Sequence, residues 1–133
     1  MVPLLNIFQS NTSILNSTIT LPDYGSFSGK IETQTLSGYD LVQPVQSWLG
    51  IEYSTQPIGE GRFAPTSHPA AFEGVRNTTK FGNVCPQPTE HIKYPELHGI
   101  GEDCLSMNVF RPLNTKSGAE LPVLVFVHGV CLS

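Results

Sequence analysis

The chain has 133 residues, of which 39% are hydrophobic and 14% charged, a composition typical of a globular protein rather than a disordered one. Its formal net charge of −4 provides no basic excess for phosphate groups, which argues against a nucleic-acid partner. No apolar run approaches the roughly 20 residues that a membrane-spanning helix needs, so no membrane span is predicted.

Residues 1–17 are predicted to be a leader or a disordered start. Met1–Phe8 is apolar but has no Lys or Arg and is interrupted by Pro3 and Asn6, so it is a poor secretory signal peptide. Three Asn-x-Ser/Thr sequons nevertheless suggest export and are candidates for N-glycosylation: Asn11, Asn16 and Asn77. The sequons therefore suggest export with a weak or missing signal peptide, and the family resemblance described below implies a secreted protein.

The first predicted element is a β-hairpin, in which Thr18–Leu21 and Phe27–Thr35 flank a Pro/Gly turn at Pro22–Ser26. Two further strands are predicted, at Tyr39–Val45 and Ser47–Tyr53. Pro44 has no N–H to donate to a ladder, so an edge or bulged strand is expected there rather than a central one. Residues 54–101 are rich in Pro and Gly without helical periodicity, and we expect long irregular loops.

The last predicted strands follow an acidic turn. Cys104 leads into a short strand that Pro112 stops, and after a polar loop comes Val123–Val127. This second run is apolar at every position, a pattern typical of a strand covered on both faces in a parallel sheet. Its covering helices would have to come from elsewhere, because the chain stops at Ser133. Residues 18–133 are therefore predicted to be interrupted at this end, before the strand has its covering layers.

Five sequence blocks in a fixed order resemble the N-terminal portion of a type-B carboxylesterase, the family of cholinesterases and fungal lipases. They are Gly50-Ile51-x-Tyr53, Gly59-Glu60-x-Arg62-Phe63, Phe81-Gly82-x-x-Cys85-Pro86-Gln87, Glu102-Asp103-Cys104-Leu105-x-x-Asn108-Val109 and Pro122-Val123-x-Val125-x-x-His128-Gly129. The resemblance implies an α/β class and an incomplete α/β-hydrolase fold. Its expected parts are the hairpin, edge strands, the first parallel strand of the central sheet and long loops.

Cys85 and Cys104 bracket 18 residues. The resemblance implies that they form a disulfide, which would contribute about 3 kcal/mol to stability in the chain-entropy description. Two alternatives are open: two free buried thiols, or a zinc site that includes His91 and His98. The gaps of five, six and five residues between these four side chains do not match usual zinc spacings, and no metal site is predicted.

The resemblance also implies a structural ion pair between Arg62 and Glu102, which would connect the cysteine loop to the first long loop and orient it more than stabilise it. A role for Glu102 or Asp103 as a catalytic acid is not expected. The sequence contains no identified nucleophile with which either carboxylate could act.

His128 and Gly129 close the apolar strand, where the resemblance implies that an oxyanion hole begins. In the family a Gly-Gly-Gly run follows, and the N–H groups of its second and third glycines stabilise the tetrahedral intermediate. Only Gly129 matches this run. Val130 and Cys131 stand at the two donor positions, and a β-branched valine restricts the backbone there.

No catalytic triad is predicted. Ester hydrolysis in this family needs a Gly-x-Ser-x-Gly elbow, an acidic partner and a distal histidine, and the elbow does not occur in the sequence. His68, His91 and His98 are expected to be surface loop residues.

The resemblance implies that the full-length protein hydrolyses small-molecule or lipid esters through an acyl-serine, without metal or organic cofactor, and that this chain alone is inactive. One alternative is a secreted, non-catalytic cholinesterase-like binding protein. Another is the non-functional product of a retained intron, because Val130-Cys131 can be encoded by GTATGT, a common 5′ splice sequence, at the point where glycines are expected.

Overall fold

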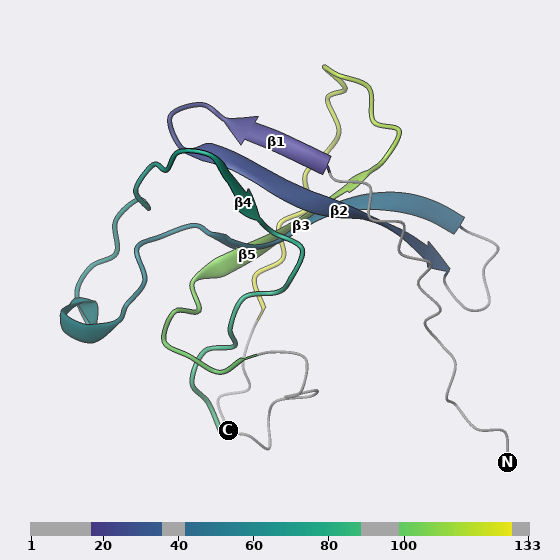
Figure 1. Ribbon diagram of the computed structural model, residues 1–133. Coiled ribbons are helices and arrows are strands. Elements are labelled where there is room, and N and C mark those ends of the chain that lie inside the picture. Colours follow the sequence, from purple (N-terminus) through teal and green to yellow (C-terminus); the bar gives the residue numbers. More distant parts are fainter. Residues whose placement is uncertain (1–16, 36–41, 89–98, 129–133) are drawn as a thin grey trace, which may run out of the picture.

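The computed structural model describes residues 17–35, 42–88 and 99–128, and these residues form one five-stranded sheet. The elements are β1 (Ser17–Leu21), β2 (Gly25–Thr35), β3 (Val42–Glu52), the 3-10 turn η1 (Gly59–Gly61), β4 (Val75–Asn77) and β5 (Ser106–Pro112). Strands β1, β2, β3 and β5 are neighbours in that order, and β4 pairs with β2 (Figure 1). No helix in the described part of the chain is long and apolar enough to cross a membrane.

The predicted hairpin is confirmed by β1 and β2, which pair antiparallel from Ser17 opposite Gly29 to Leu21 opposite Gly25. The N–H of Tyr24 donates to the carbonyl oxygen of Leu21 at 3.2 Å and closes the turn. Asp23 has a φ of 60°, and a positive φ after a proline is the pattern of a type II turn. The Pro/Gly chemistry that predicted the turn is therefore what forms it.

Strand β3 is central, so the edge-strand prediction is wrong for this segment. It pairs antiparallel with β2 on one side and with β5 on the other. Pro44 lies near its start, opposite Thr33 of β2, and the carbonyl oxygen of Pro44 accepts a hydrogen bond of 3.0 Å from the N–H of Leu113. A proline is tolerated here because it stands at the end of the β5 ladder rather than in the middle of it.

The predicted strands Tyr39–Val45 and Ser47–Tyr53 contribute to one strand, β3, whose bulge lies not at Pro44, where one was predicted, but between Trp48 and Ile51. Gly50 has a φ of +69°, a conformation that residues with a Cβ rarely adopt. A Cβ on Gly50 would also lie 3.0 Å from the backbone nitrogen of Gly82. The freed N–H of Gly50 donates to Oδ1 of Asn108 on β5 at 3.0 Å. The bulge therefore lets the loop after β4 cross β3 closely while β5 still supplies a hydrogen-bond partner.

The long loop between β3 and β5 returns to the sheet through β4, a short parallel strand that was not predicted. The next residue, Thr78, is only 4% exposed. Its N–H donates to the carbonyl oxygen of Ser28 at 2.9 Å, and its carbonyl oxygen accepts from the N–H of Leu49 at 2.7 Å. Thr78 thus fills the point at which β2 and β3 separate and anchors the loop there.

A small core lies on one face of the sheet. Phe27 and Trp48 are 1% and 2% exposed, and Ile51 completes the buried cluster, against which Ile19, Tyr24 and Phe72 pack. The indole N–H of Trp48 donates to the carbonyl oxygen of Ser17 at 3.0 Å, so the polar atom of this buried side chain is satisfied. Aromatic side chains thus make up four of the six residues of this cluster.

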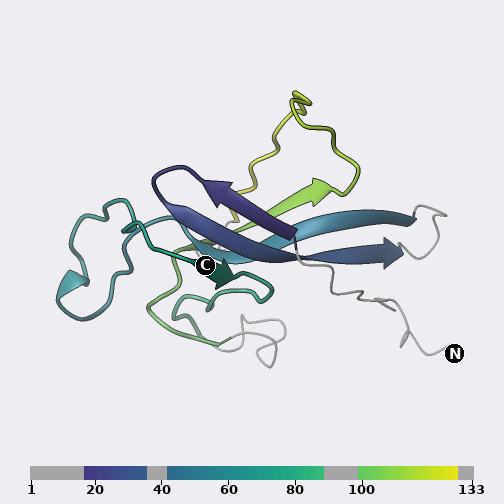
Figure 2. The same ribbon diagram turned by 45° about the horizontal axis from the view of Figure 1, so that its top comes forward.

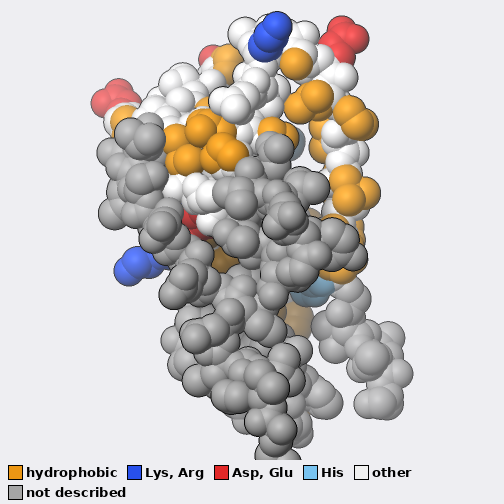
Figure 3. Space-filling model, turned by 90° about the vertical axis from the view of Figure 1, so that its right-hand side faces the viewer, with side chains coloured by type: hydrophobic (Ala, Val, Ile, Leu, Met, Phe, Trp, Pro, Cys, Tyr) orange, Lys and Arg blue, Asp and Glu red, His pale blue; other side chains and the backbone are white. Residues whose placement is uncertain are grey.

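The expected parallel strand at Val123–Val127 is not formed. These residues belong to no strand, and their side chains are between 75% and 94% exposed. Figure 3 shows a column of exposed hydrophobic side chains along one edge of the molecule. A strand buried on both faces needs neighbouring strands and covering layers, and the described residues provide neither for this segment.

Candidate functional site

Residues from separate sequence blocks meet around the start of β5. Gly50 of the first block is hydrogen-bonded to Asn108 of the fourth, and Arg62 of the second block contacts Glu102 of the fourth. Figures 1 and 2 show the loop that carries η1 projecting away from the sheet before the chain returns to β4. The first, second and fourth of the blocks that carry the family resemblance are therefore held together in space as well as in order.

Cys85 and Cys104 form a disulfide with a Cα–Cα distance of 5.1 Å. Both sulfur atoms are bonded to each other, so neither is a free thiol or a thiolate ligand for zinc. The described residues contain no group of three or more His, Cys, Asp or Glu side chains that could hold a metal ion. His91 and His98 lie outside the described residues.

Backbone contacts close the cysteine loop beside the disulfide. The N–H of Val84 donates to the carbonyl oxygen of Gly99 at 2.8 Å. The N–H of Gly101 donates to the carbonyl oxygen of Val84 at 3.1 Å. Nδ2 of Asn83 donates to Oδ1 of Asp103 at 2.7 Å. Asp103 therefore has a structural partner, and the two ends of the loop are aligned independently of the covalent bond.

Arg62 lies directly after η1 and forms an ion pair with Glu102. The hydrogen bond that Arg62 donates to Glu102, and then the negative charge of Glu102, raise the pKa of Arg62 above its usual value. The two side chains are 54% and 35% exposed, so water screens much of the attraction. The pair thus fixes the position of the first long loop against the cysteine loop and adds little to stability.

Gln56 makes a second connection between these loops, and sequence reasoning did not identify it. Its Oε1 accepts from the N–H of Leu105 at 2.9 Å, and its Nε2 donates to the carbonyl oxygens of Leu105 and Ser54, each at 3.1 Å. The carboxamide thereby pairs with Leu105 as a neighbouring strand would. A glutamine in a Pro/Gly-rich loop has no sequence signal for this role, because the contact spans 49 positions of the chain.

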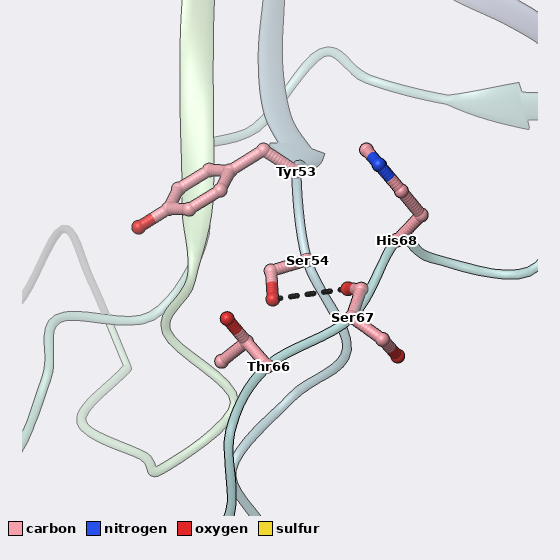
Figure 4. Close-up of a pocket in the computed structure, with 5 residues that line it drawn as sticks. All are labelled: Tyr53, Ser54, Thr66, Ser67 and His68. Carbon is pink, nitrogen blue, oxygen red and sulfur yellow. Dashed lines mark hydrogen bonds between the residues drawn. The ribbon is translucent and has the colours of Figure 1, made fainter.

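An open pocket of about 270 Å³ lies at the base of the first long loop, lined by Tyr53, Ser54, Thr66, Ser67 and His68 (Figure 4). It combines serine hydroxyls with an imidazole, the side chains of a nucleophile and its general base. The Ser54 hydroxyl donates to the backbone carbonyl oxygens of Thr55 at 3.1 Å and Ser67 at 3.3 Å. No hydrogen bond in the described structure joins His68 to either serine, and Figure 4 shows its ring directed away from the Ser54 hydroxyl. The pocket does not contain an activated serine.

The remaining predicted site residues are not brought together. His128 is exposed at the end of the unpaired apolar segment. Gly129, Val130 and Cys131 lie outside the described residues, as do Asn11 and Asn16. Asn77 is exposed at the end of β4.

The carboxylesterase family matches residues 16–132 of the chain. Secreted lipase 4 of Gibberella zeae is 39% identical over 111 residues, which are 84% of this chain and 20% of the lipase. The para-nitrobenzyl esterase of Bacillus subtilis is 40% identical over 103 residues, which are 76% of this chain and 19% of the esterase. The chain spans about a fifth of the length of these curated relatives.

Among solved structures, Aspergillus niger EstA matches with a TM-score of 0.58 and 29% sequence identity, over 80% of this chain and 18% of that one. A thermophilic para-nitrobenzyl esterase matches with a TM-score of 0.56 and 37% identity, over 71% of this chain and 18% of that one. These matches confirm the predicted fold class, an incomplete part of the α/β-hydrolase fold.

Proposed function

Because the chain belongs to the carboxylesterase family, we propose that residues 18–133 are the N-terminal part of a serine carboxylic ester hydrolase. A leader or disordered start would precede them as predicted for residues 1–17, except that Ser17 is the first residue of β1. The observation that carries this proposal is the family match over 16–132. The disulfide and the ion pair support it, because they join the blocks in which the family resemblance lies.

In the whole enzyme this part would shape the substrate entrance and would not perform the chemistry. The disulfide, Gln56 and the Arg62–Glu102 pair would hold two loops in fixed positions beside β5. A serine nucleophile from a later segment would form the acyl-enzyme, and His128 would lead into the oxyanion hole. The substrates would be small-molecule or lipid esters, and the acyl-serine route requires no metal or organic cofactor.

The 133-residue chain alone is expected to be inactive, because it lacks the Gly-x-Ser-x-Gly elbow. A fluorophosphonate probe labels only activated serines. We expect no labelling of the purified chain and no hydrolysis of para-nitrophenyl esters above a heat-treated control. The full-length product of the same gene should be labelled at a serine beyond residue 133. Stoichiometric labelling of the 133-residue chain itself would overturn the proposal.

We further propose that the protein is secreted. Its relatives include a secreted lipase, and a disulfide persists in the oxidising environment outside the cytosol. An antibody against this chain should detect the full-length protein in the culture medium of its host. Detection only in the reducing cytosol would contradict this part of the proposal.

Two alternatives have their own tests. The exposed apolar segment Val123–Val127 favours a retained-intron product that aggregates, or else a binding protein that uses this surface. A spliced transcript that continues in frame with glycines after Gly129 would support the retained-intron alternative. A monodisperse, folded 133-residue product with a defined partner would support the binding protein.

A further inference from the structure

The face of the sheet opposite the core is polar where β1, β2 and β4 lie together. The pairing places Thr18, Ser28 and Asn77 in one row across these strands. In the next row Thr20 and Ser26 are hydrogen-bonded through their hydroxyls at 2.8 Å. Side chains alternate between faces along a strand, so the neighbours of these residues point to the core.

The contrast with the core face is clear at β4. Arg76, next to Asn77, lies over the ring of Phe72 at 3.8 Å and is paired with Glu52 at 3.2 Å. Arg76 is opposite Phe27, which is 1% exposed. A bulky group would therefore displace aromatic packing at position 76. At position 77 it would meet hydroxyl-bearing side chains, solvent and, in the next row, Val75, which pairs with Ser26 and is 60% exposed.

Asn77 begins the sequon Asn77-Thr78-Thr79, and the two polar side chains of this sequon are in contact. Oδ1 of Asn77 accepts hydrogen bonds from the N–H of Thr79 at 3.0 Å and from its hydroxyl at 2.6 Å. The middle residue, Thr78, is buried and fixed between β2 and β3. The carboxamide nitrogen of Asn77 makes no hydrogen bond to the described part of the chain and remains available at an exposed position.

We propose that Asn77 carries an N-linked glycan that stands on the polar face of β1, β2 and β4, and that this face is exposed to solvent in the whole protein. The inference rests on the export part of the proposed function. The donor is an oligosaccharide linked to a lipid through a diphosphate. The nitrogen of Asn77 forms a bond to the anomeric carbon of the sugar, the bond from that carbon to the diphosphate oxygen breaks, and the nitrogen loses one proton. The lipid diphosphate is the leaving group.

The test uses the full 133-residue chain with a foreign signal peptide in a eukaryotic secretory host, so that acceptance of the glycan does not depend on the native leader. Asn11→Gln and Asn16→Gln remove the other sequons. We expect one glycan on this background, visible as one mobility step lost on treatment with peptide-N-glycosidase and as aspartate at position 77 in the released peptide. Thr79→Ala should abolish the step and Thr79→Ser should retain it. A secreted product with no step would overturn the site while leaving the proposed esterase function untouched.

A shifted sequon in the full-length protein, expressed in the same host, tests the choice of face. Arg76→Asn with Thr79→Ala moves the acceptor one residue, to the core side of β4. Arg76→Gln with Thr79→Ala is the matched control without a sequon. We expect the shifted glycan to lower the secreted, protease-resistant yield below that of the control, and the glycan at Asn77 to leave the yield equal to that of Asn77→Gln. An equal loss of secreted, protease-resistant yield with the glycan at position 76 or at position 77 would show that the face of Asn77 is packed against other structure. It would overturn the second half of the proposal.

Discussion

Strands β2 and β3 and the segment 121–128 all carry large apolar side chains, yet only the strands bury them. Phe27 on β2 is 1% exposed, whereas Phe126 in the terminal segment is 85% exposed. The two 11-residue strands pair with each other from Lys30 opposite Ser47 to Thr35 opposite Val42 and share an aromatic core, while the terminal segment has no partner among the described residues. An apolar, β-branched sequence therefore favours a strand but does not form one alone. A neighbouring strand and a covering layer are also needed.

The largest expected effect tests this contrast directly. Trp48→Ala removes a side chain that is 2% exposed and packs in the core cluster, so the free energy of unfolding should fall by about 3–5 kcal/mol. Val125→Ala, in a side chain that is 75% exposed, should change it by less than about 0.5 kcal/mol. Urea denaturation of the full chain, followed by circular dichroism, measures both.

Either of two results would contradict this difference between the buried core and the exposed terminal segment. A large loss in Val125→Ala would mean that the terminal segment is packed in solution. A negligible loss in Trp48→Ala, with the same slope of free energy against urea as the parent chain, would mean that the core cluster does not stabilise the sheet.

Removal of the disulfide should have the second largest effect on the free energy of unfolding. This region is stabilised by a cross-link rather than by burial. Cys85→Ser with Cys104→Ser should lower the free energy of unfolding by about 3 kcal/mol, because the bridge restricts a loop in the unfolded chain. Both chains should carry Cys131→Ser so that the third cysteine cannot exchange. Dithiothreitol should reproduce the loss in the parent and have no effect on the double variant. A dithiothreitol effect of equal size in both would show that it acts elsewhere.

The hairpin was predictable because its signals are local. Pro22 and Gly25 flank the turn, and the side-chain alternation that places Phe27 in the core can be seen within a few residues. The position of β3 was not predictable, because Pro44 suggested an edge and nothing local reveals that β5 pairs on its other side. Strand β4 was missed for the same reason, since its only sequence signal is three residues long.

The candidate site shows a similar division. The pairings of Cys85 with Cys104 and of Arg62 with Glu102 were expected only through the family resemblance, since spacing alone left free thiols and zinc open. The contact of Gln56 with Leu105 could not be predicted, because the geometry of a long loop determines it. The apolar pattern of Val123–Val127 predicted a strand whose partners the described residues do not contain.

The smallest expected effect lies at the edge of the core, where Tyr24 joins β2 to β3. Its hydroxyl donates to the carbonyl oxygen of Glu52 at 2.9 Å, so Tyr24→Phe should lower the free energy of unfolding by about 1 kcal/mol at neutral pH. Burial raises the pKa of Tyr24 above its usual value of 10.0, the charge of Glu52 raises it further, and the charge of Arg76 opposes both. The folded state therefore favours the protonated phenol.

The sign of the pH dependence follows from that direction. The stabilisation by Tyr24 is fully present below about pH 10, the pKa in the unfolded chain, and is lost as the pH rises through the higher pKa of the folded state. The difference in stability between the parent and Tyr24→Phe should consequently shrink in urea titrations from about pH 8 to about pH 11. Tyr53→Phe is the control, because the hydroxyl of this 48% exposed side chain makes no hydrogen bond within the described residues. A constant difference for Tyr24→Phe over this range would show that the phenol is solvated, and that this margin of the core is as open as the terminal segment.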